Sequence, residues 1–270
     1  MMAAPRRSRD PENDDRRRGR DLRPPHERTL LRVCGLAAVG ALFDTDPGRV
    51  ERLFFEARRR AEAGRFCAVL SRLRKPYREV EASELARIAG TALHSGIAAI
   101  ARPQPLGSFD PAAAPGWATD GKPLLVLDGV GNPHNLGAIA RTAAFFGIER
   151  IVLADRPDQA LPSDASYRVA EGGLDHLTVY RARVPGDLLG LRPAYRILGT
   201  SLAEGSIPVG RVADGPVTLI LGNEETGLDP ATLAACDEVV RIPGGGRVQS
   251  LNVASAAAIL IYLLTRSPSR

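Results

Sequence analysis

Three polar, glycine-containing segments of the sequence carry the side chains whose types could perform chemistry. They span residues 128–137, 221–228 and 242–253, and each begins at or just after an apolar run typical of a buried strand. Ligands of open α/β sheets bind beyond the carboxyl ends of the strands, so the sequence predicts one site built from three loops. The candidate polar side chains in or near these loops are Asn135, Arg141, Glu224, Ser250 and Asn252.

Each segment also has an ordinary structural interpretation. The first joins a strand to an apolar helix, and Asn135 could be the N-cap of that helix, with Arg141 on its surface. The second could be a turn with two solvated acids, and the third a flexible loop that ends in the helix caps Ser250 and Asn252. Three consecutive glycines at 244–246, however, forgo side-chain packing and leave backbone amides and carbonyls exposed.

Regular alternation of strands and helices after Lys122 predicts how these loops are positioned. Short connections between the elements favour an α/β fold with a mostly parallel sheet. Helices are predicted over 136–146 and 251–264, and the second is apolar on nearly every face, so we expect its own domain or a partner subunit to bury it. The predicted strands are 124–127, 151–154, 177–180, 196–200, 217–221 and 238–242.

The residues before Lys122 divide into three parts. Residues 1–28 are rich in arginine, acids and proline, with almost nothing apolar, which predicts a disordered basic tail that either binds a partner or only aids solubility. Residues 29–103 alternate short strands and helices and predict a small α/β domain. Residues 104–122 are rich in proline, which predicts an extended linker between two domains, with Trp117 pinning it to one of them.

Charge is distributed unevenly along the 270 residues. Residues 1–110 hold 22 basic and 15 acidic residues, a net charge of +7, whereas residues 111–270 hold 14 and 16, a net charge of −2. The first part is therefore predicted to meet a polyanion. Because 34 of the 36 basic residues are arginine, a GC-rich coding genome would produce the same excess.

Composition and cysteine usage bound the class of protein. No uninterrupted apolar run reaches the roughly 18 residues of a membrane helix, and the N-terminus lacks an apolar signal core. Cys34, Cys67 and Cys236 are an odd number and lie far apart, which favours neither a disulfide framework nor a zinc site. We therefore expect a cytoplasmic globular protein with no membrane segment and no metal.

Taken together, the three segments resemble the signature motifs of the SpoU (TrmH-type) RNA ribose 2′-O-methyltransferases, a family of the SPOUT superfamily. The matching stretches, in the family's order, are DGVGNPHNLGAIAR, LGNEETGL and IPGGGRVQSLNVASAAAIL. The resemblance covers residues 124–264, and residues 30–103 are more faintly similar to the family's N-terminal substrate-binding domain. Gly244 departs from the pattern, since a methionine often follows Ile-Pro there, and Arg247 adds charge to the loop.

This resemblance implies a fold, a cofactor and an activity. It implies a trefoil knot in the C-terminal domain, a homodimer, and transfer of a methyl group from S-adenosylmethionine to a ribose 2′-hydroxyl of rRNA or tRNA. It places the candidate polar side chains in the active site. Since a guanidinium stays protonated in proteins, we expect Arg141 to hold a phosphate and stabilise the developing alkoxide rather than act as the base. The residues implied to bind the cofactor, largely through main-chain atoms, are Thr200, Gly222, Ile242 and Leu251.

Three other functions are weighed against this one. A non-catalytic RNA-binding or ribosome-assembly protein with the same fold would be expected to lack Asn135, Arg141 or Glu224, and all three are present. A base methyltransferase of another SPOUT branch is disfavoured by the Ser-Leu-Asn-Val stretch. A dinucleotide-dependent oxidoreductase would need a glycine fingerprint and a ribose-binding acid that the sequence lacks. His94 and His134 are interpreted as structural residues.

Overall fold

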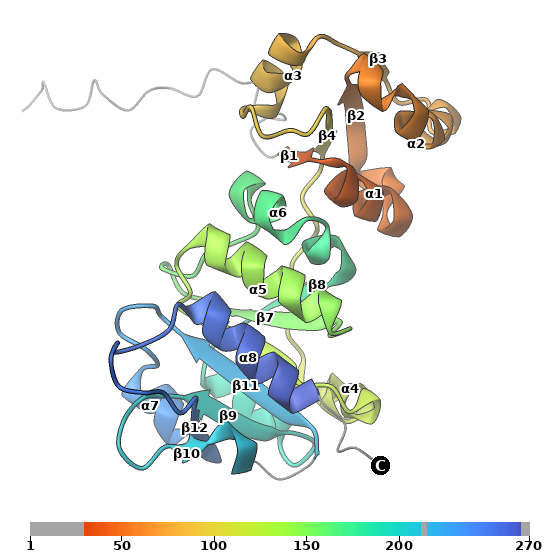
Figure 1. Cartoon of the computed structure of the whole chain (residues 1–270). Coiled ribbons are helices and arrows are strands. Elements are labelled where there is room, and N and C mark those ends of the chain that lie inside the picture. Colours follow the sequence, from red (N-terminus) through yellow and green to blue (C-terminus); the bar gives the residue numbers. More distant parts are fainter. Residues whose placement is uncertain (1–29, 212–214, 266–270) are drawn as a thin grey trace, which may run out of the picture.

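The computed structural model describes residues 30–211 and 215–265, so the predicted tail at 1–28 lies outside the described residues. The described chain forms a small four-stranded sheet followed by a larger eight-stranded one (Figure 1). We call residues 31–101, with the small sheet, the small unit, and residues 107–265, with the larger sheet, the large unit. No helix in the described ranges is long and apolar enough to cross a membrane.

In the small unit, strand β4 is central and pairs antiparallel with β1 and with β2. Strand β3 extends the sheet in parallel beside β2. Its strands are β1 (Leu31–Cys34), β2 (Val50–Phe55), β3 (Tyr77–Glu79) and β4 (Ile97–Ala101), and its helices are α1 (Leu36–Thr45), α2 (Arg60–Arg72) and α3 (Ala82–Ala89). Helix α2 buries Ala63, Phe66 and Leu70, which recur at helical spacing, and leaves its basic residues outside.

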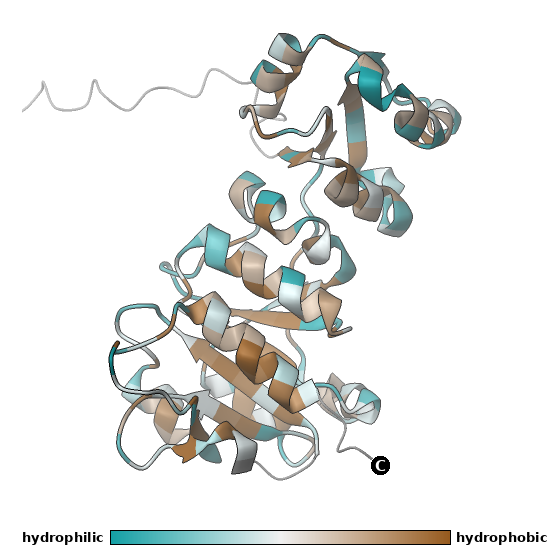
Figure 2. Ribbon diagram, viewed as in Figure 1, coloured by the Kyte–Doolittle hydropathy of each residue, from teal (hydrophilic) through white to brown (hydrophobic). Residues whose placement is uncertain are grey.

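In the large unit all strand pairs are parallel, in the order β10-β12-β9-β11-β6-β7-β8-β5. The central strands β6 and β11 are buried throughout, which is why they read as continuous apolar runs (Figure 2). This sheet confirms the predicted parallel α/β architecture. Its strands are β5 (Gly107–Ser108), β6 (Leu124–Asp128), β7 (Arg150–Ala154), β8 (Thr178–Ala182), β9 (Arg196–Thr200), β10 (Ile207–Pro208), β11 (Val217–Gly222) and β12 (Glu238–Arg241).

Two long helices of the large unit, α5 and α8, lie side by side over one face of the sheet (Figure 1). Helix α5 buries Leu136, Ile139 and Ala143, and α8 buries Leu260 and Ile261. Helix α8, which the sequence predicts over 251–264, is therefore covered by its own sheet and by α5, and part of its surface stays exposed. The helices of this unit are α4 (Ala114–Trp117), α5 (Pro133–Phe145), α6 (Asp164–Ala170), α7 (Pro230–Ala234) and α8 (Val253–Thr265).

The structure differs from the sequence analysis at the start of α5. Asn132, and not Asn135, is the N-cap, and its side-chain oxygen accepts a hydrogen bond from the backbone amide of His134. Pro133 then occupies the first turn, where its missing N–H costs nothing. Asn135 is therefore inside the helix, and its side chain is free for another role.

A second difference concerns residues 104–122, which are not an extended linker. They form β5, which pairs with β8, then a 3₁₀ turn (Pro111–Ala113) and α4. The Trp117 ring packs 5.2 Å from that of Tyr180 and 6.0 Å from that of Phe109, measured between centroids. Trp117 thus attaches this segment to the large unit, as the sequence analysis allowed, and residues from 107 onward are part of that unit's sheet.

Candidate active site

The three motif loops leave the same edge of the larger sheet. Strands β12, β9, β11 and β6 are consecutive neighbours in one parallel sheet, so their carboxyl ends lie side by side. Thr200 ends β9, Gly222 ends β11, and Ile242 directly follows β12. Asp128 ends β6 and begins the first loop. The three motifs therefore begin at one edge of the sheet, as predicted.

A chain of hydrogen bonds joins the three loops. The side-chain amide of Asn135 donates to Oε1 of Glu224 at 2.7 Å, and its carbonyl oxygen accepts from Nδ2 of Asn252 at 3.1 Å. Asn252 also caps α8, since its Oδ1 accepts from the backbone amide of Ala254. A carboxylate only accepts hydrogen bonds, so Glu224 fixes which way the Asn135 amide is turned.

Glu224 also reaches the backbone of the first loop. Its carboxylate accepts from the amides of Gly131 at 3.3 Å and Asn132 at 3.4 Å, in addition to Asn135. These residues border an open cleft of about 760 Å³, whose lining also includes Asn223, Glu225 and Asn252. The cleft is polar, and three of the five candidate side chains, Asn135, Glu224 and Asn252, lie together on its wall. We call these three side chains the polar cluster.

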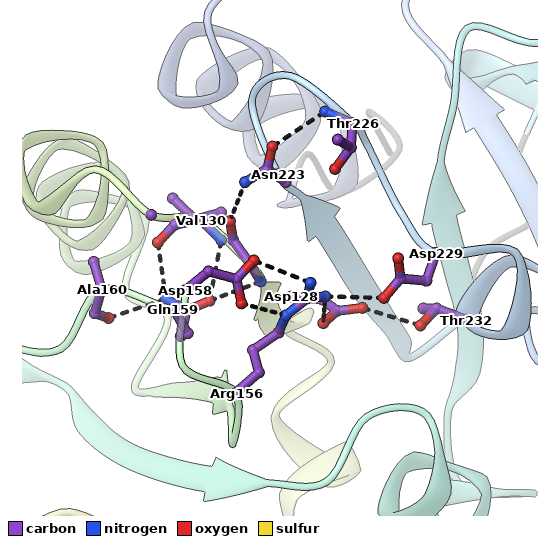
Figure 3. Close-up of polar contacts among 12 residues, drawn as sticks. Asp128, Val130, Arg156, Asp158, Gln159, Ala160, Asn223, Thr226, Asp229 and Thr232 are labelled. Carbon is purple, nitrogen blue, oxygen red and sulfur yellow. Dashed lines mark hydrogen bonds and ion pairs between the residues drawn. The ribbon is translucent and has the colours of Figure 1, made fainter. Parts of the chain in front are cut away.

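The first loop is held from beneath by Gln159, which lies after β7 and is 5% exposed (Figure 3). Its side-chain oxygen accepts from the amides of Gly129 and Val130 at 3.0 and 3.1 Å, and its nitrogen donates to the carbonyls of Val130 and Ala160. Asn223, in the second loop, donates to the carbonyl of Gly129. The N–H and C=O groups of Gly129 are therefore both hydrogen-bonded.

Arg156 joins the same loop to the start of α7 (Figure 3). Its guanidinium contacts Asp128 at 3.1 Å, Asp229 at 3.0 Å and Asp158 at 2.6 Å, and the hydrogen bonds to Asp158 and Asp128 raise its pKa. Asp128 is 2% exposed and also accepts from the hydroxyl of Thr232. Arg156 and Gln159 are not among the predicted site residues, because nothing in their local sequence marks a contact with a loop about 30 residues away.

The second loop depends on a glycine at position 222. A Cβ atom there would lie 2.5 Å from the backbone carbon of Gly227 and 2.6 Å from the nitrogen of Leu228, so only glycine fits without moving backbone. Asn223 and Gly227 exchange two backbone hydrogen bonds that close the loop. The nearby Thr200 donates its hydroxyl to the carbonyl of Ile220, which ties β9 to β11.

The third loop is different, because residues 243–251 make no hydrogen bond within the part of the chain that the structure describes. Ser250 is exposed and outside the polar cluster, and Leu251 is 47% exposed. Glycines 244–246 would meet nothing within 4 Å if they carried a Cβ. Ile242, at the start of the loop, packs against the core.

Arg141 also lies apart from the polar cluster. It is six residues beyond Asn135 on α5, which moves it about 9 Å along the helix and turns it to another side. Its guanidinium forms an ion pair of 2.9 Å with Glu171, and both side chains are about half exposed. No group of three or more His, Cys, Asp or Glu side chains among the described residues could hold a metal ion.

Two family models match this chain. Residues 122–262, more than half of the chain, match the SpoU rRNA Methylase family. Residues 32–106 match the family described as RNA 2′-O ribose methyltransferase substrate binding.

Similar proteins and solved structures agree with these matches. The 23S rRNA (guanosine-2′-O-)-methyltransferase RlmB of Acinetobacter baylyi is 32% identical over 237 residues, which cover 84% of this chain and 94% of that protein. The RlmB of a Burkholderia species is 31% identical and covers 88% and 96%. An AdoMet-bound rRNA methyltransferase from Sinorhizobium meliloti shares the fold, with a TM-score of 0.73 and 24% identity over 88% of each chain. The chain belongs to the SpoU rRNA methylase family.

Proposed function

We propose that this protein transfers a methyl group from S-adenosylmethionine to a ribose 2′-hydroxyl of ribosomal RNA. The observation that carries the proposal is the polar cluster, in which Asn135, Glu224 and Asn252 from three separate motifs bond to one another at one sheet edge. Three relatives that match this chain over more than nine tenths of their own length are named as 23S rRNA guanosine-2′-O-methyltransferases, which supports a guanosine in 23S rRNA as the target.

The residues at the sheet edge fit this cofactor. Thr200, Gly222 and Ile242 end or follow three adjacent strands, and the backbone of 243–251 offers amides and carbonyls without partners inside the described chain. Leu251 adds an exposed apolar side chain beside them. Recognition through main-chain atoms at these four positions is the proposed binding mode, and a trefoil knot formed by the loops after β11 and β12 is proposed with it.

When bound, S-adenosylmethionine supplies an electrophilic methyl group on a sulfonium sulfur. The methyl group would pass from that sulfur, which would keep the bonding electron pair, to the ribose 2′-oxygen, which would lose its proton. Arg141 stays protonated, holds the adjacent phosphate through two N–H groups and stabilises the developing alkoxide. The phosphate or a water accepts the proton. Asn135, Glu224, Ser250 and Asn252 orient the ribose and the loops around it.

We also propose a homodimer, supported by an exposed apolar face. Phe145 on α5 is 82% exposed, and Ile259 and Leu263 on α8 are 37% and 36% exposed. These two helices are neighbours, and exposed apolar side chains of this size on adjacent helices are typical of a protein–protein interface. Arg141 lies one helical turn from Phe145, and dimerisation through this face would place Arg141 at the edge of the interface.

RNA binding is assigned to the small unit. The division into a substrate-binding domain at 29–103 and a methyltransferase domain is part of the proposal, with the second domain beginning at β5 (Gly107–Ser108) and not at the predicted residue 123. The exposed side chains of Arg58, Arg60 and Arg78 support it, and affinity for RNA is expected to fall steeply with salt. A cytoplasmic location is supported by three free cysteines.

The decisive experiment maps 2′-O-methyl groups in total RNA from cells with and without the gene, and then restores the lost site in vitro with purified protein. One lost and restored ribosomal site would support the proposal. A lost transfer RNA site would change the substrate, and no lost site would favour the non-catalytic RNA-binding alternative.

Arg141→Lys separates the two roles of the arginine. Because lysine cannot replace the two-pronged phosphate contact, we expect nearly all activity to be lost across the whole pH range. Rates of RNA methylation between about pH 6 and 10 check this. A normal rate restored at high pH would instead support a role as base.

A further inference from the structure

The small unit contacts the large unit at two places, at α6, where Arg32 pairs with Asp164 at 2.9 Å, and at a short segment beside Arg141. Residues 171–176 follow α6 and include the 3₁₀ helix η6 (Gly173–His176), which packs against α1 on one side and α5 on the other. Figure 1 shows this segment, which follows α6 along the chain, between α1 and α5. We call residues Glu171–Asp175 the junction segment.

Two consecutive glycines allow the junction segment to fit between the helices. A Cβ at Gly172 would lie 2.6 Å from the Cβ of Ala41 in α1, and one at Gly173 would lie 2.7 Å from the Cα of Arg141 in α5. Gly172 also has a φ of 95°, which other residues rarely adopt. The backbone of the segment is therefore in direct contact with the small unit and with the backbone of Arg141.

Charged residues at the two ends of the junction segment reach in opposite directions. At one end Glu171, with a φ of 45°, holds the guanidinium of Arg141 at 2.9 Å. At the other end Asp175 forms a 2.7 Å ion pair with Arg49 of the small unit. A shift of the small unit would therefore be passed along a few bonded residues to Arg141.

The Arg49–Asp175 pair is buried, unlike most ion pairs of this protein. Arg49 is 6% and Asp175 8% exposed. The same guanidinium donates to the hydroxyl of Tyr167 at 3.0 Å and to the backbone carbonyl of Arg102 at 3.0 Å, so all three of its nitrogens are used. Planar guanidinium donors fix geometry as well as charge, so this contact sets an orientation between the units.

We propose that Arg49, Asp175 and Glu171 are positioning residues, through which the docked small unit sets the place of Arg141 relative to the RNA it binds. The inference rests on the proposed function, since it gives Arg141 a role in methyl transfer. It goes further by assigning the interface between the units a part in catalysis. An RNA held by the small unit then meets the arginine at a fixed distance, and a loosened interface lowers turnover without touching the cofactor loops.

Asp175→Asn tests this by leaving the Arg49 charge buried without its partner. The substrate is unmethylated ribosomal RNA from cells that lack the gene, and the readouts are kcat, KM and the affinity and stoichiometry of cofactor binding. A misplacement of about 1 Å can cost about 100-fold in rate, so we expect kcat to fall about 10- to 100-fold. Cofactor affinity is expected to stay within about twofold of wild type, because the cofactor loops leave a different part of the sheet.

Glu171→Gln is the second variant, because its ion pair is half exposed and its loss leaves no buried charge. It should lower kcat in the same way, and the double variant should be no slower than the slower single one, since both act through one segment. The matched control is Asp187→Asn, which removes a surface ion pair with Arg183 elsewhere in the large unit and should leave kcat unchanged.

The outcomes separate this inference from the proposed function. Wild-type kcat in a folded Asp175→Asn, or in Glu171→Gln when Asp175→Asn does not fold, overturns the inference, as does a parallel loss of kcat and cofactor binding. Absence of methylation by the wild-type protein overturns the proposed function instead. In that case hydrogen exchange of the α5 amides around Arg141 still tests whether the Arg49–Asp175 pair holds Arg141 in place. Faster exchange in Asp175→Asn supports this link, and unchanged exchange contradicts it.

Discussion

The first and third motif loops leave the same edge of one sheet but are held in opposite ways. In the first loop, Gly129 and Val130 are bonded on both sides by Gln159 and Asn223, and Gly131 and Asn132 are bonded by Glu224. In the third loop, residues 243–251 have no hydrogen bond to any described residue. One loop is shaped by the protein alone, and the other leaves its backbone groups available.

This difference follows from what the two loops are proposed to do. Side chains that orient a reacting hydroxyl must be fixed before the substrate arrives, because a misplaced hydroxyl reacts more slowly. Backbone groups that bind a cofactor must instead be without partners until it is present. The glycines at 244–246 keep that part of the chain free of side-chain packing, whereas Gly222 permits a tight backbone turn.

Glu224→Ala should have the largest effect, because it removes the acceptor for three donors of the first loop and α5. We expect methyl transfer to fall by about 100-fold or more, as the Asn135 amide loses its fixed orientation. Single-turnover rates with RNA measure this. Glu224→Gln keeps one acceptor oxygen and should lose less, and equal rates for the two variants would show that the carboxylate geometry does not matter.

Gln159→Leu should weaken the first loop from beneath. The leucine leaves the amides of Gly129 and Val130 buried without acceptors, which costs about 1–3 kcal/mol for each such group. Denaturant unfolding measures the loss, and the methylation rate should fall with it. Gln104→Leu, at the start of the segment that leads to β5, is a control that removes one donor bond to Leu177 and should leave the rate unchanged. A stable Gln159→Leu would contradict the proposed support.

Much of this arrangement could be predicted from the sequence, for reasons visible in particular residues. Strands β6 and β11 were predictable because burial on both faces makes them uniformly apolar. The N-cap was assigned wrongly, although Asn132 before Pro133 is the better signal for a helix start. Prolines 111 and 115 favour short helical turns as well as extended chain, so residues 104–122 were ambiguous.

Long-range contacts were beyond sequence reasoning. Gln159 and Arg156 act on a loop about 30 residues away, and Asp175 meets Arg49 across 126 positions. Such pairs leave no local period or motif, because they depend on which strands become neighbours. Arg141 and Ser250 were expected in one site with Asn135, and within the described chain the structure leaves both outside the polar cluster.

Two glycine substitutions compare the second loop with the third. Gly222→Ala places a methyl group against backbone at 2.5 Å and should destabilise the protein by about 1–3 kcal/mol and weaken cofactor binding. Gly244→Ala meets open space and should change stability by less than about 0.5 kcal/mol. Thermal unfolding and calorimetric cofactor titration measure both variants. Equal destabilisation by the two would erase the distinction between a packed loop and an open one.

Binding of the cofactor is the mildest perturbation. It should slow amide exchange in the third loop and leave amide exchange in the first loop unchanged. Amides of residues 243–251 have no acceptors in the described chain, so they should exchange with solvent rapidly, whereas Gly129 and Val130 should be protected by Gln159. Hydrogen exchange with and without S-adenosylmethionine measures both loops in one sample. Slowed exchange confined to the third loop would support a preformed polar cluster beside a cofactor loop that is ordered by its ligand. Slow exchange there without cofactor would contradict the comparison, because the loop would then be held by contacts within the protein.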